Sequence, residues 1–199
     1  MTNVLVINSS ALGAASVSRG LVSRIVSGIR EADPAASVIE RDLDAHPVPH
    51  LDGRTLAGFG GQGAAEPAAL SDALIAELKA ADVIVIGAPM YNFGIASTLK
   101  SWFDHVMRAG LTFRYTEAGP EGLVTGKRAI VALSRGGYYD ATDTQEPHLR
   151  TMLGLMGITD VAFVRAHGLA FGPEARAQGL AAAEAEADAA LGVQVKQAA

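Results

Sequence analysis

The most constraining feature of the chain is an apolar run that leads into a loop of flat side chains and then a helical pattern. Residues 82–87 read DVIVIG, a stretch typical of a parallel strand covered on both faces. Residues 88–94, APMYNFG, follow as a loop, and residues 97–107 place apolar side chains at helical spacing. Open α/β sheets bind ligands beyond the carboxyl ends of their strands. The sequence therefore predicts that residues 88–94 form one wall of a pocket for a flat ligand.

Strand and helix patterns alternate along the rest of the chain in the same way. The helix after the first strand is expected to stop before Pro34. Strands that alternate with helices through right-handed crossovers build a doubly wound sheet. We therefore expect a single α/β domain over residues 1–199, with a flavodoxin-like, doubly wound, five-stranded parallel sheet of order 2-1-3-4-5. The other four strands are expected at residues 3–8, 36–41, 128–133 and 160–165.

Local signals place the ends of several elements. Ser16 or Ser18 is the expected N-cap of the first helix, and Ser71 after Leu70 is the expected N-cap of the helix before residue 82. Residues 112–124 predict a short hairpin around a Gly-Pro turn. Residues 42–67 are rich in Gly and Pro and are expected to be irregular. The GxGxxG match at residues 58–63 predicts a loop, because no strand leads into it.

The expected strand order opens a crevice between the first and third strands. The loop at residues 9–18 flanks that crevice, carries four serines and leads into a helix N-terminus. Free N–H groups and the positive end of the helix dipole favour an anion there. The alternative is simply a well-capped helix. We favour a phosphate site made by Ser10, Ser16, Ser18 and the N–H group of Val17.

The other end of the crevice suits a planar ring. Met90, Tyr91, Asn92 and Phe93 offer main-chain groups and flat side chains there. Ser134 and the glycine pair Gly136 and Gly137 follow the fourth strand, and missing side chains let the backbone approach a ring edge. A phosphate at one end and a flat heteroaromatic at the other describe a mononucleotide, and FMN fits best. Backbone N–H groups at the polar edge of the ring would stabilise the charge of a reduced flavin.

Composition narrows the alternatives. The net charge of −5 argues against nucleic acid or an anionic membrane as a partner. The chain has no Cys, and two prolines exclude a helical metal pair of His46 and His50, so no metal site is expected. His105 and His148 are expected to be solvated or structural, because no nucleophile motif accompanies them. No signal peptide or membrane span is recognisable, so a cytoplasmic location is expected.

Six segments give the chain a resemblance to a known family over nearly its whole length. The chain resembles the FMN-dependent NADH azoreductases, which are also NAD(P)H:quinone oxidoreductases. Many motifs in the right order are far more specific than any one of them. The segments are Ser9-Ser10 with Ser16 to Ser18, APMYNF at 88–93, TFRYTE at 112–117, EGLVTGK at 121–127, SRGG at 134–137 and GITD at 157–160.

The resemblance implies a role for each part of the crevice. Ser10, Ser16, Val17 and Ser18 would hold the phosphate of a tightly, non-covalently bound FMN. Met90, Tyr91, Asn92 and Phe93 would line its isoalloxazine ring, and Ser134, Arg135, Gly136 and Gly137 would close the pyrimidine edge. No side chain is expected to be catalytic, because flavin N5 is the reactive atom. The candidates for the substrate pocket are Tyr91, Phe93, Phe113, Tyr115 and Leu155.

The resemblance also implies a reaction and an assembly. Two electrons would pass by a ping-pong mechanism from NADH or NADPH to quinones and aromatic azo compounds, with no separate dinucleotide fold. The protein would be a homodimer with its active sites at the interface. The alternative is a flavodoxin-like carrier of single electrons for a protein partner. Such carriers are usually strongly acidic around the flavin, whereas this chain carries only a small negative excess.

Two segments depart from the family pattern. Residues 52–67 form a glycine-rich loop with Arg54 as its only cation, and a loop of this kind would choose between NADH and NADPH or act as a lid. Residues 138–140, YYD, also differ, and together with Leu155 they would face the acceptor. The preferred donor and the range of acceptors therefore do not follow from the resemblance.

Overall fold

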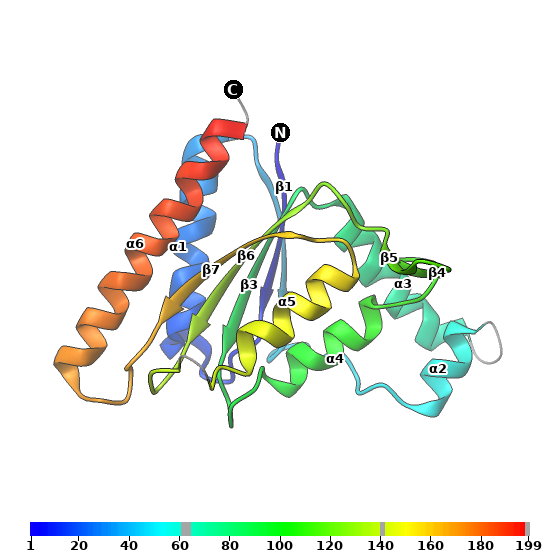
Figure 1. Ribbon diagram of the computed structural model, residues 1–199, viewed down its shortest axis with the longest axis horizontal. Coiled ribbons are helices and arrows are strands. Elements are labelled where there is room, and N and C mark those ends of the chain that lie inside the picture. Colours follow the sequence, from blue (N-terminus) through cyan, green and yellow to red (C-terminus); the bar gives the residue numbers. More distant parts are fainter. Residues whose placement is uncertain (61–64, 140–141, 198–199) are drawn as a thin grey trace.

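The computed structural model describes residues 1–60, 65–139 and 142–197. A five-stranded parallel sheet lies in the middle, in the order β2-β1-β3-β6-β7 (Figure 1). This confirms the expected flavodoxin-like sheet of order 2-1-3-4-5, because β6 and β7 take the fourth and fifth places. The strands are β1 (Asn3–Asn8), β2 (Ser37–Asp42), β3 (Val83–Pro89), β6 (Arg128–Ser134) and β7 (Asp160–Ala166). The skipped numbers belong to a separate antiparallel hairpin, β4 (Phe113–Thr116) and β5 (Gly119–Gly122).

Helices cover both faces of the sheet. One face is covered by α1 (Val17–Ala32) and α6 (Pro173–Gln197), and the other by α3 (Ala65–Ala80), α4 (Ser97–Val106) and α5 (Gln145–Leu155) (Figure 1). Successive side chains of a strand point to opposite faces, so each strand feeds two cores. Val83 and Val85 of β3 join the α1/α6 core, whereas Ile84 and Ile86 join the α3/α4/α5 core. All seven residues of β3 are buried, as a strand covered on both faces requires.

The helix ends follow the local signals in one case and not in another. Ser16 is the N-cap of α1, because its Oγ accepts a hydrogen bond from the N–H of Arg19 at 3.2 Å, and α1 ends before Pro34. The expected N-cap at Ser71 is wrong. Helix α3 begins six residues earlier, at Ala65, and Ser71 lies inside it. Its Oγ instead donates to the backbone carbonyl of His105 at 2.5 Å, which ties α3 to the end of α4.

A short helix occupies part of the segment that the sequence predicts to be irregular. Helix α2 (Gly53–Phe59) is capped by Asp52, whose Oδ1 accepts from the backbone N–H of Thr55 at 2.8 Å and from its hydroxyl at 2.7 Å. Asp is a preferred N-cap residue, a local signal that the glycine content of the segment obscures. The first three residues of the GxGxxG match end this helix, and residues 61–64 lie outside the described ranges.

The β4–β5 hairpin is fastened to the C-terminal end of α5. The N–H of Val124 donates to the carbonyl of Met156 at 2.8 Å, just beyond the hairpin. Gly122 lies so close to this turn that a Cβ atom there would be 2.2 Å from the backbone nitrogen of Gly157. Helix α5 runs back from the carboxyl ends of the strands, so the hairpin lies toward their amino ends (Figure 1). The excursion expected at residues 112–124 is thus confirmed as a hairpin.

We predict that Gly122→Ala lowers the free energy of unfolding by about 1–3 kcal/mol, because the added methyl group meets backbone that cannot rotate away. Gly154→Ala is the matched control. Its added Cβ meets nothing within 4 Å, and it lies in α5. The control is expected to be neutral or to stabilise by about 0.5–1 kcal/mol. Urea unfolding measures both, and equal effects would contradict the close backbone approach at Gly122.

Candidate functional site

Loops that follow β1, β3, β6 and β7 meet at the carboxyl edge of the sheet. Strand β1 lies between β2 and β3, so the position at which the sequence predicts a crevice, between β1 and β3, is flanked by the loops at residues 9–16 and 90–96. The Oγ of Ser9 donates to the carbonyl of Gly87 at 2.7 Å, which ties the ends of β1 and β3 together. The hydroxyl of Tyr91 lies 3.4 Å from the Oγ of Ser10 and accepts from the N–H of Ala11 at 3.1 Å. The two loops are therefore joined by a single phenol.

The N-terminus of α1 supplies donors to this crevice. Ser16 and Ser18 are buried, and their hydroxyl oxygens lie 3.1 Å apart. Val17 and Ser18 begin the helix, where backbone N–H groups have no intrahelical acceptor. The nearby guanidinium of Arg19 donates to Asp42 at 2.8 Å. Two hydroxyls, two N–H groups and the positive end of the helix dipole can thus receive an anion.

The loop after β3 is a strained two-residue turn. The N–H and carbonyl groups of Tyr91 pair with those of Gly94, each at 3.0 Å, and the residues between have φ values of +48° for Asn92 and +66° for Phe93. Positive φ at both central residues defines a type I′ turn, in which Gly normally takes the place of Phe93. Left-handed backbone strains a bulky residue by about 1–3 kcal/mol. The turn leaves Phe93 64 % exposed, and its ring meets that of Tyr139 edge-on.

The loop after β6 is organised by a buried arginine. Arg135 is only 1 % exposed, and its guanidinium donates to Gln145 at 3.0 Å and to Asp143 at 2.9 and 3.1 Å. Gln145 in turn donates to the carbonyl of Ala88 at the end of β3, at 2.9 Å. The Arg135 side chain is therefore turned inward and positions the loop. Burial alone would raise the pKa of the Asp143 carboxyl. The backbone N–H groups of Glu146 and Gln145 and the guanidinium of Arg135 donate to it, and together they hold its pKa below the ordinary value.

The structure brings most of the predicted site residues together. Those in the three loops lie at the carboxyl edge, and Met90 donates its N–H to the carbonyl of Ser134 at 2.9 Å. Phe113 and Tyr115 do not join them, because they lie on the β4–β5 hairpin. Leu155 is the last residue of α5, near that hairpin. The residues at the edge are Ser10, Ser16, Val17, Ser18, Met90, Tyr91, Asn92, Phe93, Ser134, Arg135, Gly136 and Gly137.

A further loop belongs to this edge that the sequence interpretation missed. Residues 167–172 follow β7, and the N–H groups of Gly168, Leu169 and Ala170 donate to the carbonyls of Gly137, Arg135 and Gly136 at 3.1–3.2 Å. The ring of Tyr138 stacks against two aromatic side chains of this loop, His167 and Phe171. The sequence signal for this loop is that His167 and Phe171 are each followed by a glycine, directly after the last strand. Of the three residues expected to face the acceptor in this region, Asp140 lies outside the described residues.

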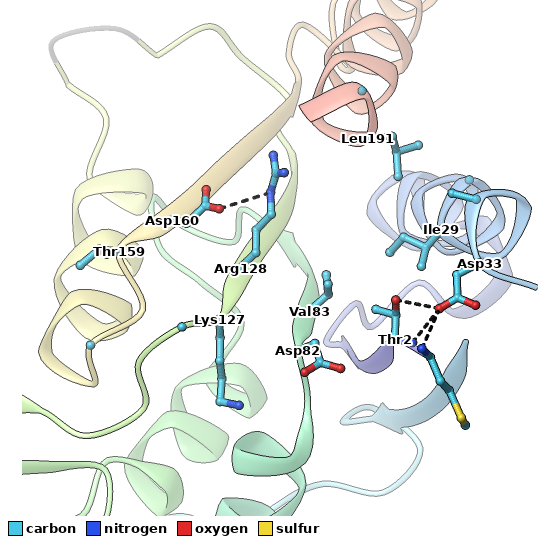
Figure 2. Close-up of a pocket in the computed structure, with 16 residues that line it drawn as sticks. Thr2, Ile29, Asp33, Asp82, Val83, Lys127, Arg128, Thr159, Asp160 and Leu191 are labelled. Atoms are coloured by element: carbon cyan, nitrogen blue, oxygen red, sulfur yellow. Dashed lines mark hydrogen bonds and ion pairs between the residues drawn. The ribbon is translucent and has the colours of Figure 1, made fainter. Parts of the chain in front are cut away.

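The opposite edge of the sheet holds a cavity of about 1010 Å³ with different chemistry (Figure 2). The first residues of β3, β6 and β7 line it, together with Ile29 of α1 and Leu191 of α6. Arg128 is buried there, 3.8 Å from Asp160, and neither its Nε nor its Nη1 forms a hydrogen bond within the described ranges. Ile29 and Ala32 in the last turns of α1 line the same cavity, so the negative end of the α1 dipole lies at its wall (Figure 2). This negative potential offsets the positive charge of Arg128 and would repel a phosphate.

Comparison with known proteins agrees with the fold. The family model described as "Flavodoxin-like fold" matches residues 2–191, which defines the class of protein. The chain is 52 % identical over 195 residues to an FMN-dependent NADH:quinone oxidoreductase of Hyphomonas neptunium, with 94 % of each chain covered. It is 54 % identical to a protein of the same name from Ralstonia nicotianae, with 92 % of this chain and 93 % of that one covered.

A solved structure gives the same result. The FMN-dependent NADH-azoreductase of Bacillus anthracis, in complex with FMN, superposes with a TM-score of 0.87 at 27 % identity and covers 98 % of this chain and 100 % of that one. The chain belongs to the family of FMN-dependent NADH:quinone oxidoreductases. This confirms the family, the enzyme class and the cofactor FMN that the sequence predicts, and NADH is one of the two donors that it leaves open. Within the described residues, no helix is both long and apolar enough to cross a membrane.

We predict that two substitutions of Phe93 differ in stability although both remove the ring. Phe93→Gly relieves the left-handed strain and should unfold at a free energy equal to or above that of the wild type. Phe93→Val places a β-branched residue at positive φ and should be less stable than the Gly variant by about 1–2 kcal/mol. Chemical denaturation of both variants measures the difference. A Val variant as stable as the Gly variant would contradict the type I′ turn.

Proposed function

We propose that this chain passes two electrons from NADH or NADPH to quinones, and to aromatic azo compounds, at the carboxyl edge of its sheet. The observation that carries the proposal is that a group of anion-binding donors and a flat aromatic wall lie on opposite sides of the gap between β1 and β3. The α1 N-terminus offers hydroxyl and N–H donors, and the Tyr91–Gly94 turn presents a flat wall across from it. The names of relatives of more than 50 % identity support the same chemistry.

The residues present fit FMN. Ser16, Ser18 and the N–H of Val17 would receive its phosphate, since the two hydroxyls lie together at the start of α1, where backbone N–H groups have no intrahelical acceptor. Met90 to Phe93 would lie along the ring. The backbone at Gly136 and Gly137 can approach the ring edge because it carries no side chain there. When bound, FMN supplies the hydride and electron chemistry at N5, and the protein supplies binding, orientation and exclusion of water.

A ping-pong order requires the donor and the acceptor to use the same binding surface one after the other. The exposed ring of Phe93 and the half-buried ring of Tyr139 form one wall beside the turn, and we propose that donor and acceptor bind against it one after the other. Phe93 is held there by its strained turn and by the hydroxyl of Thr144, which donates to its backbone carbonyl. A rigid, exposed ring favours any planar partner that can slide over the flavin, which suits both a nicotinamide and a quinone.

A homodimer would complete the site. Three of the predicted pocket residues lie away from the carboxyl edge of the sheet, so they could contact substrate only in a second copy. They are Phe113, Tyr115 and Leu155. The Tyr115 side chain is 76 % exposed and packs edge-on against Phe113 at 5.5 Å, which leaves its outer face free for a partner. We propose that the hairpin of one subunit supplies these aromatic side chains to the substrate pocket of its partner.

The phosphate assignment makes a testable prediction. Replacing Ser16 and Ser18 together with Ala removes two hydroxyl donors and the N-cap, so FMN affinity should fall by about ten- to a hundred-fold. Riboflavin has no phosphate, so its affinity should change by less than about threefold. Fluorescence titration of the apoprotein with each flavin measures both. An equal loss for FMN and riboflavin would place the phosphate elsewhere.

The function itself is tested by an anaerobic visible spectrum of the FMN-loaded protein. Bleaching of the flavin absorbance by NADH alone, and its recovery on addition of a benzoquinone, is the expected result. Flavin that binds but is not bleached by NADH or NADPH would favour the alternative, a single-electron carrier that depends on a separate reductase. Repeating the cycle with an aromatic azo compound in place of the quinone decides the second acceptor class.

A further inference from the structure

We propose that Tyr138 and Phe171, together with the arginine-lined cavity beside them, bind the adenosine diphosphate half of the dinucleotide donor. The inference rests on the proposed function for the identity of the donor. It gives a binding role to Tyr138 and the loop after β7, which the proposed FMN site does not use. Three observations carry it: an exposed aromatic stack, an arginine-lined cavity that adjoins it, and contacts that connect both to the ring of Phe93.

The first observation is the aromatic stack of Tyr138, His167 and Phe171. The rings of Tyr138 and Phe171 are nearly parallel, at 4° with centroids 5.7 Å apart, and His167 stacks on Tyr138 at 22° and 6.3 Å. Tyr138 is nevertheless 61 % exposed and Phe171 64 % exposed. Parallel aromatic rings left open to water form a platform on which a purine can stack, because every base presents a π-face.

The platform is held in place by backbone. Gly168 has φ +69°, and a Cβ atom there would lie 2.4 Å from the hydroxyl oxygen of Tyr138, so the ring lies directly over a bare glycine. The N–H of Gly168 donates to the carbonyl of Gly137, and that of Ala170 to the carbonyl of Gly136, which fixes the β7 loop against the β6 loop. A pre-positioned platform costs a ligand little ordering entropy.

The second observation is a cavity of about 510 Å³ between this stack and α5. Its wall contains Arg135, Arg150 and Arg165 against two carboxylates, Asp143 and Glu146. Glu186 of α6 also pairs with Arg165 but does not line the cavity. Arg150 is half exposed, and its guanidinium lies over the Phe163 ring at 4.5 Å while it donates to Glu146 at 2.9 Å. An oriented, solvent-accessible guanidinium is suited to a diphosphate.

The third observation is continuity. His167 belongs both to the stack and to the cavity wall, and Tyr139 belongs to that wall and meets Phe93 edge-on at 6.0 Å. One extended ligand could therefore place a nicotinamide at Phe93, a diphosphate beside Arg150 and an adenine on Tyr138 and Phe171. A quinone at Phe93 has no diphosphate or second ring system with which to reach the stack. The chemistry of the extension matches the donor and not the acceptor.

The kinetic test compares two donors that differ only in the adenylate. The double variant Tyr138→Ser with Phe171→Ser should lose about five- to a hundred-fold in kcat/KM for NADH, the range measured for stacked bases. With reduced nicotinamide mononucleotide, which lacks the adenylate, kcat/KM should stay within about threefold of the wild type. Ile39→Ala is the matched control. It removes an exposed apolar side chain on β2, away from the carboxyl-edge loops, and should change neither value.

A binding test needs no turnover. ADP-ribose carries adenine and diphosphate without nicotinamide, and calorimetric titration of the FMN-loaded protein should detect its binding. The double variant should weaken ADP-ribose and adenosine alike, whereas Arg150→Gln should weaken ADP-ribose only, because adenosine has no phosphate. Near-ultraviolet circular dichroism and the flavin spectrum confirm that each variant keeps its fold and cofactor.

The outcomes separate the possibilities. Selective loss for NADH and ADP-ribose supports the proposal. Equal loss for both donors would show a structural role for the stack, and a raised KM for quinone with unchanged NADH kinetics would assign it to the acceptor. Either result overturns the inference, as does an ADP-ribose affinity that the variants leave unchanged. If the wild type oxidises neither donor, the proposed function fails, and the ADP-ribose titration still decides the inference.

Discussion

The architecture depends on the complete burial of β3 between two parallel neighbours. Each face of this strand packs into a different core, so its register with β1 and β6 cannot slip by one residue without exchanging the two apolar sets. The strand also lets its neighbours come close. A Cβ atom at Gly87 would lie 3.1 Å from Asn8 and 3.2 Å from Val22 of α1. The loops at the carboxyl edge owe their fixed spacing to this strand.

Polar contacts extend that order from the strands into the loops. Arg135 and Gln145 form a buried relay that links the β6 loop, the start of α5 and the end of β3. A buried guanidinium is tolerated because Asp143 neutralises it and Gln145 takes a further N–H. Among the described residues, Arg128 at the other edge of the sheet has one ion-pair partner, Asp160 at 3.8 Å, and the C-terminal end of α1 also lies at its cavity. The same residue type thus organises a loop in one place and is merely accommodated in another.

The sequence reveals the elements better than it reveals the turns. Runs such as residues 82–87 predict strands because burial on both faces leaves no polar alternation, and Ser16 predicts its cap because that signal is local. Ser71 misleads, because its hydroxyl serves a tertiary contact with His105 that no local pattern encodes. The positive φ of Phe93 is equally hidden, since a bulky residue rarely adopts it. The aromatic stack joins Tyr138 to residues 29 and 33 positions later, which are brought together only when β6 and β7 pair.

Tyr91 gives the crevice a property that neither of its loops has alone. Its hydroxyl meets Ser10 and the N–H of Ala11 on the far side of the crevice, so the phosphate end and the ring end share one side chain. A ligand that draws Ser10 away from this phenol also changes the freedom of the wall on which its own ring must lie. The two halves of a mononucleotide then bind with a coupling free energy, and by reciprocity each half alters the affinity for the other by the same factor. Fragment affinities measured separately therefore cannot simply be summed to give the affinity of the whole.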